Sequence, residues 1–121
     1  MIRRVPRSAP ARQSEPFTRF GRYAGPATLI LSSLADGTKH GYALTKDIED
    51  FAEVRISPGT MYEALARLES QGLIEPVESD DRRRPYKLTA DGALALRAHL
   101  DVQRRVADVG LRRLRSSADV G

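Results

Sequence analysis

The stretch from Ser57 to Leu88 constrains the fold more than any other part of this 121-residue chain. It opens with Ser-Pro, a pair typical of the N-cap and the first position of a helix. At 100° per residue, four apolar side chains then fall in one sector of about 100°, namely Met61, Ala64, Leu65 and Leu68. Gly72 indicates where this helix stops. We therefore expect a short amphipathic helix from Pro58, with one face in the core and one polar face.

A β-hairpin is predicted directly after this helix. Alternating apolar side chains indicate two short strands, at Leu73, Ile74 and Val77 and then at Tyr86 and Leu88. The turn between them is strongly charged and consists of Asp80, Asp81, Arg82, Arg83, Arg84 and Pro85. Because proline donates no backbone hydrogen bond, Pro76 requires an edge strand or a bulge, which suits a hairpin of two strands.

Two helices are expected before residue 57. Pro26 suits a first helical position, and the helix it begins should end at Asp36-Gly37. Its apolar side chains at helical spacing are Ala27, Ile30, Leu31 and Leu34. A second helix should begin near Gly41 and place three side chains on one apolar stripe, Leu44, Ile48 and Phe51. At the start of this helix, Tyr42 is expected to be a core residue. His40 is expected to be a structural or backbone-bonded residue.

A long last helix is predicted from Ala90 to about Arg115, with Thr89 as its cap and Asp91 near its positive end. It carries two apolar sectors. The leucine sector consists of Leu96, Leu100, Ala107, Leu111 and Leu114. The valine sector, roughly opposite, consists of Ala95, Ala98, Val102, Val106 and Val109. A helix with one apolar sector can bury it against a single neighbouring element. Two apolar sectors on the last helix of so small a chain imply that a second chain covers one of them. We predict a homodimer with the valine sector as its interface.

Composition narrows the class of protein. The chain is long enough for one domain with a single core, and 40% of its residues are hydrophobic. It contains no cysteine, so disulfides and thiolate metal sites are excluded, and its two histidines are not at ligand spacing. No motif of an enzyme or a cofactor site is present, and no apolar run approaches the ~20 residues needed to span a membrane. Without a secretory signal, a cytoplasmic location is expected.

The basic charge is unevenly placed. Residues 1–23 carry six arginines and one glutamate, a net charge of +5. The remainder has 14 basic and 15 acidic residues and is close to neutral. Prolines and serines among these arginines predict a flexible arm, either a solvated tail or an arm that follows DNA phosphates. The net charge of the whole chain is therefore weak evidence that residues 24–121 bind nucleic acid. The positions of the individual basic residues are the better evidence.

This order of elements is a winged helix-turn-helix, mainly α with a small β-hairpin, followed by a long C-terminal dimerisation helix. The residues resemble the PadR family of transcriptional regulators over about residues 24–100. Three motifs carry the resemblance: HGYAL at residues 40–44, ISPGTMYEALARLESQGLI at 56–74 and RRRPYKLTADG at 82–92. The short C-terminus resembles the branch with a single dimerisation helix. We expect an arm at 1–23, a DNA-binding domain at 24–89 and a dimerisation helix with its tail at 90–121.

The resemblance implies a dimer that binds a palindromic promoter operator in double-stranded DNA, commonly as a repressor, sometimes relieved by a small effector. It also implies DNA contacts at the positions matching Thr60 and Tyr62. From the residues alone, Ser57, Gly59 and Thr60 form a helix start whose free N–H groups attract phosphate. The full set of expected DNA contacts is Lys46, Ser57, Gly59, Thr60, Tyr62, Arg67, Arg82, Arg83, Arg84 and Lys87.

The basic residues of this set can also be interpreted without DNA. Arg67 could read guanine in the major groove, or it could pair with Glu63 one helical turn earlier. The tip arginines could contact phosphates or pair with Asp80 and Asp81 in solvent. Acidic residues on the helix from Pro58 also leave open a winged module that binds proteins and not DNA. A third alternative is an effector-responsive sensor of the same fold.

Overall fold

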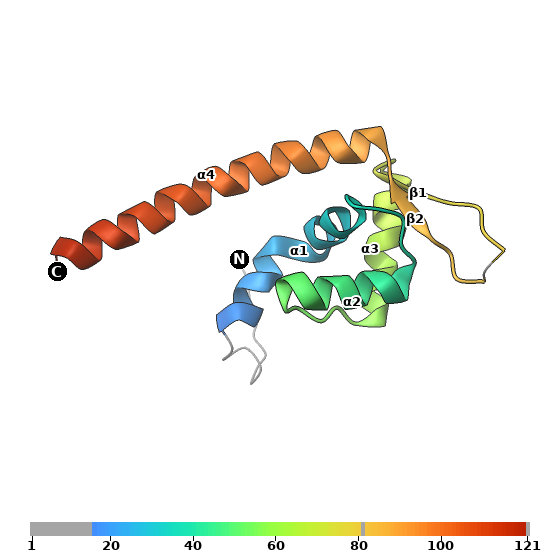
Figure 1. The fold of residues 1–121 in the computed structure, drawn as a ribbon, viewed down its shortest axis with the longest axis horizontal. Coiled ribbons are helices and arrows are strands. Elements are labelled where there is room, and N and C mark those ends of the chain that lie inside the picture. The colour runs from blue at the N-terminus through green and yellow to red at the C-terminus, as the bar shows by residue number, and fades with distance from the viewer. Residues whose placement is uncertain (1–15, 81, 121) are drawn as a thin grey trace, which may run out of the picture.

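The protein, described by a computed structural model over residues 16–80 and 82–120, is a small helical body with two projections (Figure 1). For residues 16–24, 119 and 120 the description covers the backbone alone. The order of elements is α1 (Pro16–Leu34), α2 (Gly41–Ala52), α3 (Pro58–Ser70), β1 (Ile74–Pro76), β2 (Tyr86–Leu88) and α4 (Ala90–Val120). Helices α1, α2 and α3 form the body, from which the hairpin and α4 extend in different directions (Figure 1). The predicted fold class is confirmed.

Helix α1 consists of two helical segments that meet at Gly25, where φ is 76° and ψ is 147°. Pro26 begins the second segment, as predicted, because its fixed φ suits a first helical turn. The earlier segment, from Pro16, falls within the range expected to be a flexible arm, and its backbone is helical. Phe17, Phe20 and Ala24 stand at helical spacing there, a signal that the prolines and arginines had obscured. The rest of the expected arm, residues 1–15, lies outside the described residues.

The core is built from the apolar faces of α1, α2 and α3. The buried hydrophobic side chains are Leu29, Ile30, Leu31, Leu34, Leu44, Ile48, Ile56, Met61, Leu65, Leu68, Ile74 and Leu96. Two of the residues expected on the apolar stripes of α1 and α2 are exposed. Ala27 is exposed although it lies on the same side of α1 as Ile30 and Leu34, because it belongs to the first turn of the second segment and burial begins at Leu29. Phe51 is 51% exposed, because in the last turn of α2 it is the neighbouring Ala52 that packs against the core.

His40 is the N-cap of α2. Its Nδ1 accepts a hydrogen bond from the Ala43 amide at 3.4 Å, and its backbone is extended. Because Nδ1 acts as the acceptor, it carries no proton in this arrangement. The prediction of a backbone-bonded residue at the start of this helix is confirmed.

The hairpin pairs β1 with β2 in antiparallel register, with Glu75 opposite Lys87 and Pro76 opposite Tyr86. Tyr86 directs its backbone groups away from β1: it exchanges hydrogen bonds with Lys39, at 3.1 and 2.9 Å. Strand β2 is therefore central, with Lys39 on its other side, and β1 is an edge. Pro76 lies at a position of that edge where no donor is needed, as its sequence context predicted.

The loop that supplies Lys39 is held by a second set of contacts. The Lys39 ammonium donates to the carboxylate of Asp36. That hydrogen bond, together with the positive charge of Lys39, lowers the pKa of Asp36. Nearby, the buried Ser33 hydroxyl donates to Asp47 at 2.6 Å and so joins α1 to α2. These contacts fix the connection between α1 and α2 against the base of the hairpin.

Helix α4 begins where predicted and runs five residues further than expected, to Val120. The Thr89 hydroxyl accepts the Gly92 amide at 3.0 Å, which confirms the predicted cap. Of the leucine sector only Leu96 is buried in this chain; Leu111 and Leu114 are 59% and 69% exposed. Helix α4 leaves the body after its first turns (Figure 1), so the body covers neither sector along its length. Both sectors are thus uncovered along most of the helix.

Among the described residues, none of the helices has the length and apolar character that crossing a membrane requires.

Candidate nucleic-acid interface

The outer face of α3 is uncovered. Met61, Leu65 and Leu68 point into the core, as predicted, and Ala64 is half-buried. Their burial turns the opposite side of the helix to solvent, where Tyr62 is 69% exposed. The exposed residues of this face are Tyr62, Glu63, Ala66, Arg67 and Ser70. A helix presented in this way can enter a groove without disturbing the core.

The start of α3 is arranged to receive an anion. Ser57 is the N-cap, with its Oγ accepting the Thr60 amide at 3.3 Å, and Pro58 occupies the first turn. The Met61 amide bonds the Ser57 carbonyl at 2.9 Å. Gly59 is therefore left, in the described hydrogen bonding of this turn, with an exposed amide that donates to no group. The Ser57 hydroxyl donates to Thr60 Oγ1 at 3.0 Å, so the Thr60 hydroxyl proton remains available to a ligand.

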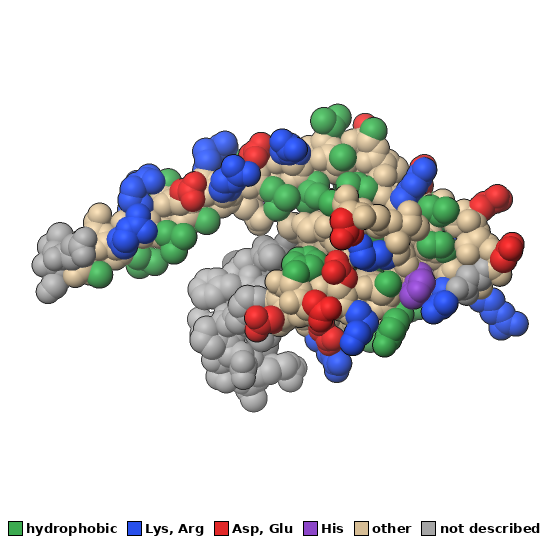
Figure 2. Space-filling view, viewed as in Figure 1, with side chains coloured by type: hydrophobic (Ala, Val, Ile, Leu, Met, Phe, Trp, Pro, Cys, Tyr) green, Lys and Arg blue, Asp and Glu red, His purple; other side chains and the backbone are tan. Residues whose placement is uncertain are grey.

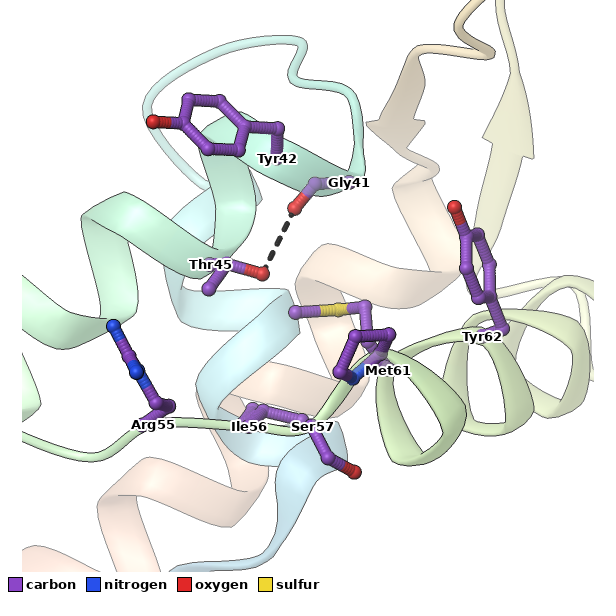
Figure 3. Close-up of a pocket in the computed structure, with 9 residues that line it drawn as sticks. Gly41, Tyr42, Thr45, Arg55, Ile56, Ser57, Met61 and Tyr62 are labelled. Carbon is purple, nitrogen blue, oxygen red and sulfur yellow. Dashed lines mark hydrogen bonds between the residues drawn. The ribbon is translucent and has the colours of Figure 1, made fainter.

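A groove of about 660 Å³ runs between the starts of α2 and α3 (Figure 3). Tyr42 and Tyr62 stand on its two sides, with Thr45 and Met61 between them (Figure 3). Tyr42 is 67% exposed, so the expectation that it belongs to the core was wrong. Its position explains this, because at 100° per residue it lies across the helix from Leu44 and Ile48.

The groove adds two residues that the sequence alone did not select, Thr45 and Arg55. Thr45 bonds the Gly41 carbonyl at 3.1 Å, and Arg55 pairs with Glu49 at 2.6 Å while remaining exposed. Lys46, which the sequence did select, is exposed on α2 one helical turn after Tyr42, hence on the same side of that helix as Tyr42. In the sequence, the exposed side of α2 was indicated by the position of Tyr42 and Lys46 opposite the apolar stripe of that helix.

The hairpin tip is both acidic and basic, as Figure 2 shows at the right of the molecule. Arg82, Arg83 and Arg84 are all exposed. Arg84 lies 3.6 Å from Glu69 of α3, and its guanidinium is 6.0 Å from the centre of the Tyr86 ring. Lys87 pairs across the hairpin with Glu75 at 3.3 Å. Both ion pairs are exposed, and a phosphate could compete for either cation.

The acidic partners expected for the basic residues differ from those in the structure. Glu63 and Arg67, both described, form no ion pair with each other, so the Arg67 guanidinium is exposed for contacts with a ligand. Arg84 pairs with a carboxylate of α3, that of Glu69. Asp81, one of the two expected tip partners, lies outside the described residues.

The groups expected from the sequence thus lie on three adjoining elements. The first turn of α3 supplies Ser57, Gly59 and Thr60, its outer face supplies Tyr62 and Arg67, and the neighbouring hairpin supplies the arginines. Lys46 is exposed on α2, one turn after Tyr42 of the groove. A helix pair with an exposed second helix and a hairpin beside it defines a winged helix-turn-helix regulator.

Comparison with known proteins gives the family. The model for the "Transcriptional regulator PadR-like family" matches residues 30–98, and the chain belongs to that family of transcriptional regulators. The crystal structure of a PadR family transcription regulator from Clostridium difficile R20291 superposes with a TM-score of 0.67 at 31% identity, over 74% of this chain and 97% of that one. The predicted resemblance is confirmed.

Two curated relatives match a similar segment. The transcriptional regulator Rv3488 of Mycobacterium tuberculosis is 40% identical over 70 residues, 55% of this chain and 64% of the relative. An uncharacterized 37.1 kDa protein in transposon TN4556 of Streptomyces fradiae is 48% identical over 64 residues, 53% of this chain and 19% of the relative. The chain therefore matches less than two thirds of the length of either protein.

Proposed function

We propose that this regulator binds double-stranded DNA in a sequence-specific manner, as a homodimer on a palindromic promoter operator, and that it represses transcription in the cytoplasm. The observation that supports DNA binding most is the uncovered polar face of α3 beside the exposed tip arginines. In this proposal residues 24–89 form the DNA-binding unit, residues 90–121 the dimerisation unit, and residues 1–23 an accessory basic arm.

Each part of the surface has a role in the proposed complex. The Gly59 amide and the hydroxyls of Thr60 and Tyr62 donate to backbone phosphates at the start of α3, and Ser57 orients Thr60 for this contact through its own two hydrogen bonds. Arg67, further along the exposed face, reaches base edges in the major groove. Arg82 and Arg83 contact phosphates or the minor groove beside it. Lys46, across the groove, and Lys87, once released from Glu75, neutralise flanking phosphates.

Dimerisation is proposed from the two uncovered sectors of α4. In Figure 2 hydrophobic side chains line the lower edge of this helix and charged ones its upper edge. Val102 and Val106 of the valine sector are exposed, as are Leu111 and Leu114 of the leucine sector. Covering these side chains with a second copy removes apolar surface from water at about 25 cal/mol per Å², and two-fold pairs are the commonest way to do so.

Selection of bound duplexes from a random pool, at low salt, tests the proposal. A two-fold dimer predicts an enriched inverted repeat with half-site centres about 34 Å apart. Enrichment of a single asymmetric half-site would contradict the dimeric arrangement. Failure to retain any duplex would contradict DNA binding altogether.

One observation favours a second candidate, a winged module that binds a protein. Glu63 is exposed in the middle of the α3 face without an arginine partner on that helix, and a carboxylate there repels phosphate. A binding assay with duplex DNA at low salt distinguishes the two functions. A protein-binding module stays unbound to duplex DNA at low salt, where a DNA-binding one binds most tightly.

A further inference from the structure

We propose that Arg84 is a positioning residue that fixes the hairpin tip against α3, and not the direct DNA contact expected from the sequence. Its functional consequence rests on the proposed DNA binding. Its structural part concerns the chain alone and can be tested without DNA.

Arg84 contacts two elements with one side chain. Its Nη2 lies 3.6 Å from Oε2 of Glu69, in the last turns of α3. The same guanidinium is 6.0 Å from the centre of the Tyr86 ring, a distance at which a cation is attracted to an aromatic face. Arg84 therefore joins the far end of α3 to strand β2.

Tyr86, which Arg84 contacts, is itself held in a fixed position. Its ring is half-buried and packs against the core. Its backbone exchanges two hydrogen bonds with Lys39, at 3.1 and 2.9 Å, and Lys39 belongs to the connection between α1 and α2. A side chain held over Tyr86 is therefore held in place relative to the whole body.

The contact lies at the base of the hairpin tip. Just beyond the paired strands, the Val77 amide donates to the Pro85 carbonyl at 2.9 Å. Pro85 has no amide with which to return a second hydrogen bond to Val77. Arg84 directly precedes Pro85 in the chain, so its side-chain contact with Glu69 holds this end of the tip against α3.

The consequence for DNA binding is geometric. Arg82 and Arg83 can meet the duplex that α3 occupies only if the tip keeps a fixed angle to that helix. Loss of Glu69 or of the Arg84 charge should release the tip and weaken binding, while every phosphate contact remains available. Since exposed ion pairs are weak, we expect each single change to weaken binding by about 2- to 5-fold.

The test compares Arg84→Gln, Glu69→Gln, Arg84→Glu, Glu69→Arg and the exchanged pair Glu69→Arg/Arg84→Glu. A positioning role predicts weaker binding for every single variant, and tighter binding for the exchanged pair than for either of its parents. For Arg84→Gln the slope of log affinity against log salt should stay at the wild-type value. A slope reduced by about 0.9 would identify a phosphate contact and overturn the proposal, as would tighter binding of Glu69→Gln, which would show Glu69 to be a mere competitor for Arg84.

A second measurement works without DNA. Nitrogen-15 relaxation of the amides in residues 78–84 reports their motion on the ps–ns timescale. We expect lower order parameters in Arg84→Gln and Glu69→Gln and recovery in the exchanged pair. Glu63→Gln, on the same helix but without an ion pair to the tip, is the matched control. Unchanged order in both variants would overturn the inference, whereas a wild-type protein that binds no DNA would refute only the proposed function.

Discussion

Gly92 lies so close to the backbone of Leu73 that a β-carbon at residue 92 would be 2.0 Å from the Leu73 carbonyl oxygen. The same oxygen accepts the Thr89 amide at 3.1 Å. The first turn of α4 is thus pressed against the connection between α3 and β1. This contact sets where α4 leaves the body, and it requires a residue without a side chain.

Replacement of Gly92 by alanine should therefore destabilise the fold. The clash is with backbone, which cannot rotate away, so we expect a loss of about 3 kcal/mol in the free energy of unfolding. Urea denaturation measures it. Gly110→Ala is the control, because nothing lies within 4 Å of a β-carbon there, and alanine within a helix should stabilise it by about 0.5–1 kcal/mol. Equal stabilities of the two variants would contradict the close contact.

Tyr62→Phe should weaken DNA binding without affecting the fold. The side chain is 69% exposed, so unfolding should change by less than about 0.5 kcal/mol. Loss of one hydroxyl hydrogen bond to phosphate should lower affinity by about 2- to 10-fold. Fluorescence anisotropy with a selected operator gives the affinity. Wild-type affinity in the variant would remove this hydroxyl from the contacts.

Charge placed on either apolar sector of α4 should disrupt the dimer. We expect Val102→Glu/Val106→Glu and Leu111→Glu/Leu114→Glu each to sediment as monomers at concentrations where the wild type is dimeric, because a buried unpaired carboxylate is strongly unfavourable. The control is Arg105→Glu/Arg112→Glu on the charged side of the same helix, which should remain dimeric. A dimer that persists in one apolar variant would show that its sector is not part of the interface.

The Asp36–Lys39 contact predicts a pH dependence of stability. The hydrogen bond and charge of Lys39 lower the pKa of Asp36 in the folded state below its ordinary value of 3.8. The folded state therefore gains from the ionised carboxylate, fully so above pH 3.8, and the gain is lost as the pH falls through the lowered pKa. The stability difference between wild type and Asp36→Asn should be constant near neutrality and shrink in acid. A difference that grows below pH 3.8 would contradict the shift.

The helix that begins at Pro58 and the following hairpin were predictable because their signals are local. Ser57, Pro58 and Gly72 mark the ends of α3 through their own backbone preferences. The apolar period of the helix then identified its buried face correctly. Its outer face, which carries the expected DNA contacts, followed by elimination.

The misjudged residues depend on relationships that a local pattern does not contain. Phe51 fits the stripe of α2, yet in its turn the core is contacted by Ala52 and the Phe51 side chain is 51% exposed. How much of α4 packs against the other helices likewise depends on the size of the body that they form, which the sequence of α4 does not contain. Arg84 and Glu69 are 15 positions apart, and their pairing arises from the path of the hairpin back along α3, which the charge pattern of the tip could not reveal.

The salt dependence of DNA binding by Arg82→Ala/Arg83→Ala tests the central claim most directly. If α3 and the hairpin tip hold a duplex together, the slope of log affinity against log salt should be smaller than that of the wild type by about 1.8, or 0.9 for each phosphate that the variant no longer neutralises. Arg105→Ala/Arg112→Ala, which removes the same charge from α4, should keep the wild-type slope. Identical slopes for the two variants, or a wild-type protein that binds no duplex at low salt, would contradict DNA binding through α3 and the hairpin tip.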